Sequence, residues 1–194
     1  MKQLTATVVS VHAGKNDDMS KDLRDSIHAE LAGFVEDAHR GYERRCWSGD
    51  KQAENTVRRN ERQWSAIAIE ELEQISSDMG LTETIGADTI GVNLCIRGVD
   101  HFSRLPKGSV LKFPSGAELV VVEFNPPCLG MGKKLAGLYK KRSGESLANT
   151  EFSKAAKLSR GLVGVIDVPG EISTGDEVSI TLYEHPSWLA ADWG

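Results

Sequence analysis

The sequence has few cysteines and no metal-binding spacing among its histidines. Its three cysteines, Cys46, Cys95 and Cys128, are an odd number without paired spacing, which argues against a secreted disulfide framework. The five histidines form no His-x-x-x-His pattern, and no Cys-x-x-Cys pair is present, so we expect no structural zinc site. A reducing cytoplasm is the compartment that this composition favours.

Long apolar runs are also missing. No stretch approaches the roughly 20 residues that a membrane-spanning helix needs, and residues 1–11 alternate after one lysine, unlike a signal peptide. The formal charge of −5 gives no reason to expect a nucleic acid or an anionic membrane as partner. An anionic ligand would therefore have to meet a local basic cluster.

The common nucleotide and hydrolase signatures are absent too. We find no G-x-x-x-x-G-K-[ST] loop, no G-x-G-x-x-G turn and no G-x-S-x-G elbow. The 194 residues, 40% hydrophobic and 26% charged, are instead typical of one globular domain with a core of its own. We expect residues 1–194 to form a single domain.

The hydrophobic pattern is mainly that of β-structure. Period-two segments predict strands at 4–12, 64–67, throughout 85–124, and at 162–168 and 177–182, with a hairpin of 110–113 and 118–124 around a Pro-Ser-Gly turn. Helical spacing predicts a helix from Ile69 to Met79 that stops at Gly80, and residues 133–142 and 151–158 carry helix formers. Some eight strands with two or three helices indicate a mainly β (α+β) domain built on a small barrel.

Three segments are harder to interpret. Residues 22–39 have helical propensity, yet Ile27, Ala29 and Leu31 recur at period two. Residues 41–60 are polar without an apolar period, which predicts a long loop. In the tail, residues 184–194, we expect Trp188 and Trp193 to pack back onto the domain.

Cys128 is the candidate reactive residue. It follows the predicted strand that ends at Phe124, after two prolines that restrict the backbone and before Gly130 and Gly132, which free it. A stiff turn at a strand end holds a nucleophile or metal ligand well, and the lysines that follow would favour the thiolate. The alternative is an inert buried thiol. We expect no chemistry at Cys95, inside a strand, or at Cys46, in the polar loop.

Polar residues elsewhere could assist Cys128. Asp37 and His39 would face the same way in an extended segment and could orient a ligand or shuttle a proton, unless they form an exposed turn. Asn93 and Arg97 share one strand face, and Arg97 and Arg160 each precede a glycine that would let a phosphate approach the backbone. The alternative for both arginines is a solvated surface charge.

Five segments together, in order, resemble the MOSC family, named after the C-terminal part of molybdenum cofactor sulfurases. The resemblance spans about residues 4–182 and rests on Gly33-Phe34-Val35-Glu36-Asp37-Ala38-His39, Arg62-Gln63-Trp64-Ser65-Ala66-Ile67, Gly91-Val92-Asn93-Leu94-Cys95-Ile96-Arg97-Gly98, Asn125-Pro126-Pro127-Cys128, and Arg160-Gly161 with the Gly-Asp turn at 175–176. Glu36 departs from the pattern, because the family tends to have glycine there, and residues 41–60 do not align. The order of segments in the family, together with the recurrence of apolar residues at every second position, predicts a strand over Ile27–Leu31.

The resemblance implies a β-barrel like that of pyruvate kinase, with peripheral helices and a pocket around the Pro-Cys loop. Members handle sulfur or bind molybdenum cofactor, and some reduce N-hydroxylated bases and amidoximes. By resemblance, Cys128 is the catalytic residue and metal ligand. The anionic pterin cofactor would be bound by a further set of residues: Asp37, His39, Asn93, Arg97 and Arg160.

Three functions follow as expectations. The first is a molybdenum-cofactor-binding oxidoreductase, which would need a separate electron donor because the sequence has no ferredoxin-like cluster motif or flavin-binding signature. The second is a non-enzymatic carrier that passes persulfide sulfur from Cys128 to a partner protein; pyridoxal-phosphate desulfurase chemistry is excluded, since no aminotransferase-like domain is present. The third is a cysteine hydrolase using Cys128 and His39, for which the sequence offers no third orienting group.

Overall fold

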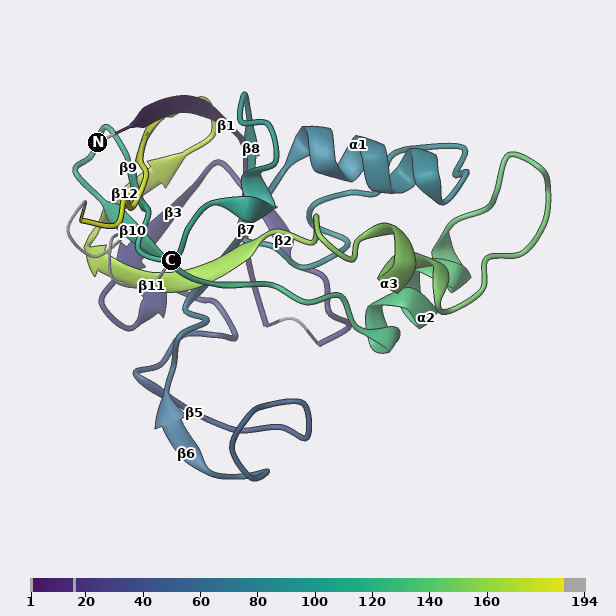
Figure 1. Cartoon of the computed structure of the whole chain (residues 1–194), viewed down its shortest axis with the longest axis horizontal. Coiled ribbons are helices and arrows are strands. Elements are labelled where there is room, and N and C mark those ends of the chain that lie inside the picture. Colours follow the sequence, from purple (N-terminus) through teal and green to yellow (C-terminus); the bar gives the residue numbers. More distant parts are fainter. Residues whose placement is uncertain (1, 16, 187–194) are drawn as a thin grey trace.

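A closed seven-stranded barrel forms the centre of the computed structural model, which describes residues 2–15 and 17–186 (Figure 1). The strands follow one another around the barrel in the order β1–β13–β9–β10–β11–β7–β8, and β8 pairs again with β1. All these pairs are antiparallel except β7 with β8. The barrel strands are β1 (Gln3–Ala13), β7 (Trp64–Ala68), β8 (Leu94–Arg97), β9 (Val110–Lys112), β10 (Glu118–Phe124), β11 (Leu162–Val168) and β13 (Glu177–Thr181). The mainly β barrel expected from the sequence is confirmed.

Alternating side chains of these strands fill the barrel, because successive residues of a strand point to opposite faces. Trp64 is fully buried there and donates its indole N–H to the Val165 carbonyl oxygen (3.0 Å). Gly164 makes this packing possible: a Cβ at that position would lie 1.9 Å from the Val120 carbonyl oxygen and 2.6 Å from the Trp64 ring. The close approach of three strands therefore depends on one missing side chain.

Three helices form a second layer at one end of the barrel (Figure 1): α1 (Ile69–Asp78), α2 (Leu129–Leu138) and α3 (Glu151–Ala155). Leu72 and Ile75 of α1 pack with Leu135 of α2 and Phe152 of α3 in a second apolar cluster outside the barrel. The apolar residues of each helix recur at helical spacing, so one face is buried. No helix in the described part has the length and hydropathy that a bilayer crossing requires.

Short strands flank the barrel. In one small sheet, β3 (Ser26–Glu30) pairs with β12 (Gly170–Ser173) and β4 (Gly33–Phe34), while β2 (Asp22–Arg24) extends the edge of β1. The predicted strand over Ile27–Leu31 is confirmed for all but its last residue. Ile27 and Ala29 are buried and His28 between them is exposed, so burial on one face outweighs the helical propensity of this segment.

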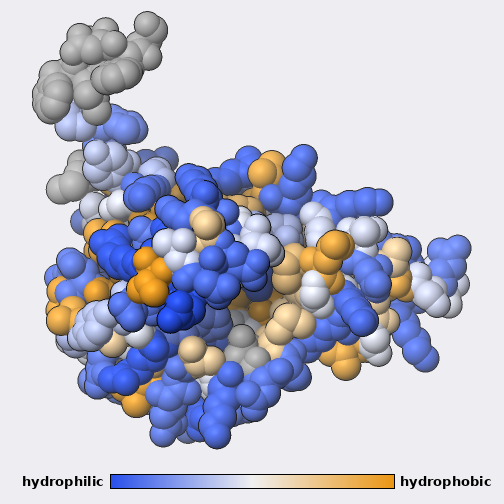
Figure 2. Space-filling model, turned by 90° about the horizontal axis from the view of Figure 1, so that it is seen from below, coloured by the Kyte–Doolittle hydropathy of each residue, from blue (hydrophilic) through white to orange (hydrophobic). Residues whose placement is uncertain are grey.

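Several boundaries differ from those predicted. The polar loop 41–60 contains a hairpin of β5 (Glu43–Arg45) and β6 (Val57–Arg59), which projects from the barrel (Figure 1). Residues 85–93 are irregular rather than β, a 3-10 turn, η1 (Phe102–Arg104), lies farther along, and α2 begins at Leu129 instead of Lys133. Seen from the side of the hairpin, hydrophilic side chains cover most of the surface (Figure 2). Trp188 and Trp193 lie outside the described residues.

Candidate functional site around Cys128

Cys128 stands between the end of β10 and the start of α2. After Phe124, the Asn125 N–H donates to the Gly161 carbonyl oxygen (2.9 Å), and two prolines lead to Cys128, the residue that caps α2. Its Sγ accepts the N–H of Met131 (3.4 Å), and the residue is exposed. Because the first N–H groups of a helix favour negative charge, this position suits a thiolate or another anionic form of sulfur.

A cavity of about 510 Å³ opens at Cys128. Its walls come from segments far apart in the sequence: the Cys128 turn, the tip of the β5–β6 hairpin, β7 and the turn before β11. Its lining contains two arginines and one histidine but no carboxylate, although the whole chain is acidic. The lining residues are Met19, His39, Trp47, Ser48, Gly49, Arg62, Ser65, Ile90, Gly91, Asn125, Pro126, Pro127, Cys128, Met131, Arg160 and Val163.

Arg160 is buried, and only one of its two terminal guanidinium nitrogens has a hydrogen-bond partner among the described residues. Nη2 donates to the Ile90 carbonyl oxygen (2.8 Å), while Nη1 is buried and has no hydrogen-bond partner within the described residues. Burial lowers the pKa of Arg160 to about 10; the charge of Cys128 opposes this shift and that of Arg62 adds to it. Arg160 therefore remains a cation at neutral pH, and an anion in the cavity would supply the missing acceptor.

Arg62 and Trp47 form another wall of the cavity. Arg62 donates to Asn125 Oδ1 (2.5 Å) and its guanidinium carbon lies 5.5 Å from the centre of the Trp47 ring. Arg44 also stacks on Trp47, at 4.4 Å. Burial lowers the pKa of Arg62, whereas the neighbouring charge of Cys128 acts to raise it. Arg62 and the Trp47 ring thus line the cavity beside the thiol, and Arg44 stacks on the same ring without lining the cavity.

His39 reaches the cavity from a buried polar network. Asp37 Oδ1 accepts the backbone N–H of His39 (2.9 Å) and lies 3.3 Å from its Nδ1, while Asp37 Oδ2 contacts Lys21 Nζ (2.5 Å) and the Asn93 amide (2.8 Å). Burial alone would raise the pKa of Asp37, but the bonds from His39 and the charge of Lys21 hold it well below its usual range. A carboxylate only accepts, so Nδ1 is the donor in this contact and Nε2 is the ring nitrogen left for a ligand.

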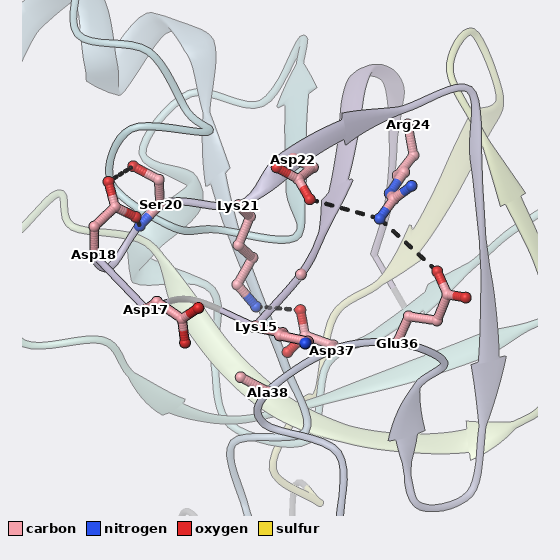
Figure 3. A pocket seen from close by; sticks show the side chains of 11 residues that line it. Lys15, Asp17, Asp18, Ser20, Lys21, Asp22, Arg24, Glu36, Asp37 and Ala38 are labelled. Carbon is pink, nitrogen blue, oxygen red and sulfur yellow. Dashed lines mark hydrogen bonds and ion pairs between the residues drawn. The ribbon is translucent and has the colours of Figure 1, made fainter.

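The Lys21–Asp37 ion pair also borders a second cavity of about 730 Å³ (Figure 3). The charges around this cavity are largely matched. Arg24 lies 3.6 Å from Asp22 and 3.8 Å from Glu36, and Asp18 bonds Ser20. Glu36 adopts a positive φ of 62°, so it has the backbone conformation that a glycine would favour at this turn.

The structure places most of the predicted site residues together, though in different roles. Cys128, His39 and Arg160 line one cavity, while Asp37 and Asn93 lie behind His39 and hold it. Arg97 lies elsewhere: it ends β8 opposite Thr7, is exposed and does not line the cavity. The candidate site therefore keeps Arg160 and not Arg97.

The N–H groups of the glycines after the two arginines are already bonded within the chain. The Gly98 N–H donates to Glu70 Oε1 (2.9 Å) and the Gly161 N–H to Ser103 Oγ (2.8 Å). A Cβ on Gly161 would lie 2.1 Å from the Ala66 carbonyl oxygen. Glycine at 161 is therefore required by the packing of β11 on β7, and the role of these glycines toward a phosphate stays a prediction.

The other cysteines and the two lysines lie apart from the cavity. Cys95 is buried and burial raises its pKa to about 12, and Cys46 is buried within the hairpin. Lys134 bonds the Thr89 carbonyl oxygen (2.8 Å) and Ser20 Oγ, while Lys133 is exposed. Neither lysine lines the cavity, so the basic environment of Cys128 comes from arginines instead.

Sequence reasoning missed three residues: Arg62, Trp47 and Lys21. Arg62 precedes the Trp64 strand, where a charge ahead of a strand carries no distinctive signal. Trp47 was the one large apolar side chain near the tip of a polar segment, which could have marked it as a contact residue. Lys21 gave no signal, because only the fold brings it to Asp37, 16 positions away.

These features, a closed barrel with a cysteine between a strand and a helix, are matched by a known family. The family model of the MOSC domain matches residues 16–179, so the chain belongs to the MOSC family.

Individual relatives cover almost the whole chain. It is 27% identical over 184 residues to a Bacillus subtilis protein described as "Putative metal-sulfur cluster biosynthesis proteins YuaD", covering 94% of each chain. The crystal structure of YuaD superposes with a TM-score of 0.88 at 26% identity, covering 94% of this chain and 99% of that one. YiiM from Geobacillus stearothermophilus shares the fold at 14% identity and a TM-score of 0.61, covering 91% of this chain and 75% of its own.

Proposed function

We propose that this MOSC protein binds a molybdenum cofactor at Cys128 and acts as an oxidoreductase on N-hydroxylated or similar substrates, with a separate electron donor. The single observation that carries the proposal is the buried Nη1 of Arg160, which has no hydrogen-bond partner among the described residues and belongs to a side chain that lines one cavity with the exposed Cys128. A buried cationic donor without an acceptor is costly, and an anionic group of the ligand would remove that cost.

The residues present fit such a cofactor. Arg160 and Arg62 would hold its anionic phosphate, the Trp47 ring offers a flat surface to a pterin, and Cys128 offers a soft thiolate ligand. A cavity of about 510 Å³ is in the usual range for sites of small molecules and cofactors. When bound, the cofactor would supply the redox-active metal.

The chain's own groups then have defined tasks. The guanidinium groups bind and orient the anionic ligand, and the hairpin tip with Trp47 forms one wall of the cavity beside the thiol. His39, held by Asp37 through Nδ1, can accept or release a proton at Nε2 on the cavity side.

A second candidate function is that of a sulfur carrier with a persulfide on Cys128. The exposed Sγ at the start of α2 favours it, since the Met131 N–H would stabilise a persulfide anion and a partner could reach the terminal sulfur. The printed description of YuaD, metal-sulfur cluster biosynthesis, points the same way. For a hydrolase, Asp37 does supply the missing orienting group, but no hydrogen bond joins His39 to Cys128 in the described residues.

Metal and sulfur analysis of the purified protein separates the two candidates. Molybdenum together with pterin supports the oxidoreductase, and cyanide-labile sulfur without metal supports the carrier. Cys128→Ser should abolish either load and leave the fold intact, because the residue is exposed. Cys46→Ser is the matched control. A full load in Cys128→Ser, or its loss in Cys46→Ser, contradicts the assignment of Cys128.

A further inference from the structure

Basic residues are concentrated in one segment of this acidic chain. Residues 129–160, which contain α2, α3 and the loop between them, hold eight lysines and arginines but only two acidic residues, in a chain whose formal charge is −5. The rest of the molecule is correspondingly acidic. Charge of one sign on one part of the surface steers the approach of partners of opposite charge.

Most of these cations are exposed, and Lys154 and Lys157 also line a cavity that contains Glu70 and Asp100. Lys134 and Arg160 point inward, and Lys141 forms an ion pair with Glu151 (2.7 Å). The remaining five are exposed, and within the described residues none forms a salt bridge: Lys133, Lys140, Arg142, Lys154 and Lys157. We call these five residues the basic helical surface.

Apolar side chains accompany these charges. Leu129, Leu138 and Leu158 are each about 60% exposed (61%, 60% and 60%) and lie on or next to α2 and α3. Leu129 directly follows Cys128, so the surface borders the candidate site. A concavity of about 610 Å³ on the same lobe is lined by Arg142 and Lys154, with Asp78 and Glu151 also on its wall. Apolar anchors among charges are typical of a protein–protein interface.

We propose that the basic helical surface is the docking site of an acidic partner protein that serves the Cys128 site. The inference rests on the proposed function, which requires such a partner in either form. A compact protein fits this surface better than a membrane or a nucleic acid. An extended polyanion would also lie close to the acidic remainder of the chain and be repelled by it, since charges act on one another over roughly 10 Å at moderate salt. Leu129, which directly follows Cys128, would give the partner an apolar contact beside the thiol, and the other two leucines would give it contacts farther along the helices.

The test measures binding to flavodoxin, a small acidic electron-transfer protein used as probe, at about 20 mM and about 200 mM sodium chloride. We expect saturable binding at the lower salt that weakens at the higher. Lys140→Glu/Arg142→Glu should weaken it about tenfold, or 1.4 kcal/mol. Lys51→Glu/Lys107→Glu, which changes the net charge equally at two exposed lysines outside the surface, should weaken it far less.

Other outcomes would overturn the proposal: no binding of flavodoxin at low salt, equal loss in both double variants, or tighter binding to phosphatidylglycerol vesicles or duplex DNA. Cys128→Ser separates this proposal from the proposed function. It should bind flavodoxin like the parent protein although its metal or sulfur is lost. The Lys140→Glu/Arg142→Glu variant should keep its metal or sulfur and lose docking.

Discussion

Arg97 and Arg160 show how environment, and not residue type, assigns a role to a side chain. Each is an arginine followed by glycine at the edge of a strand. Arg97 ends β8 and is exposed, whereas Arg160 lines the cavity of Cys128 and is buried, with one guanidinium nitrogen that has no hydrogen-bond partner in the described part of the chain. The strand edge was predictable from the sequence, but the direction of each side chain depends on how the barrel closes.

Arg160→Ala should therefore lower cofactor binding by about 1.5–3 kcal/mol, the usual contribution of a hydrogen bond to a charged group. Arg160→Lys should recover only part of this, since a lysine cannot reproduce the planar fork. The measurement is molybdenum and pterin content per folded protein. Arg97→Ala is the control and should change little. Equal content in the Arg160→Ala and Arg97→Ala variants would remove Arg160 from the site.

At the scale of elements, the β5–β6 hairpin is held by polar contacts rather than by an apolar core. Asp50 accepts two hydrogen bonds from Arg44 (2.6 and 2.7 Å) and one from the Trp47 N–H (3.0 Å), and it lies 3.6 Å from Arg58. Because of these charged residues, the sequence predicted a long loop for residues 41–60. Pairing between charged residues of one segment has no period, so sequence patterning could not reveal the hairpin.

Asp50→Asn should loosen this hairpin while the barrel stays intact, because it removes the charge that Arg44 and Arg58 share. We expect amide hydrogen exchange at residues 46–56 to become several-fold faster, with little change in the global melting temperature. Asp100→Asn, at an exposed carboxylate without an ion pair in the described residues, serves as control. Unchanged exchange in the Asp50→Asn variant would show that other contacts hold Trp47.

The strands β7, β10 and β11 depend on Gly164. Gly164→Ala would place a Cβ against the Val120 carbonyl oxygen and the Trp64 ring, and we expect it to lower the free energy of unfolding by about 3 kcal/mol, the upper end for overpacking. Gly137→Ala in α2 meets no atom within 4 Å and should raise it by about 0.5 kcal/mol. Urea denaturation measures both. Similar values for the two variants would contradict this view of the barrel wall.

For the molecule as a whole, the buried Lys21–Asp37 pair links stability to pH. The side chains of both residues are fully buried, and the pKa of Asp37 in the folded state lies below the 3.8 of a solvent-exposed, unpaired carboxyl, which is the state of Asp37 in the unfolded chain. Between those two values the unfolded chain binds the additional proton. The stabilisation by this pair is therefore complete well above pH 3.8 and is lost as the pH falls below it.

Asp37→Asn should lower the free energy of unfolding at pH 7 by about 3–5 kcal/mol, because Lys21 is left buried without its partner. Lys21→Met/Asp37→Asn should lose less, since no unpaired charge remains. Urea unfolding from pH 7 to pH 3 should show the gap between the parent and Asp37→Asn shrinking on the acid side. A gap that stays constant with pH would mean that Asp37 is not ionised in the folded protein.

The sequence by itself determined most of the barrel strands, the α1 helix, the family and the place of Cys128, because each depends on local periodicity, turn residues or short motifs. Tertiary structure alone decided that Arg62 and the hairpin residue Trp47 line the cavity of Cys128, that Arg160 and not Arg97 joins them, and that Lys21 pairs with Asp37. The physical reason is barrel closure. Once β1 pairs with both β8 and β13, the loops at each end of the barrel are brought together. The ion pairs that form between these loops follow no periodic pattern in the sequence.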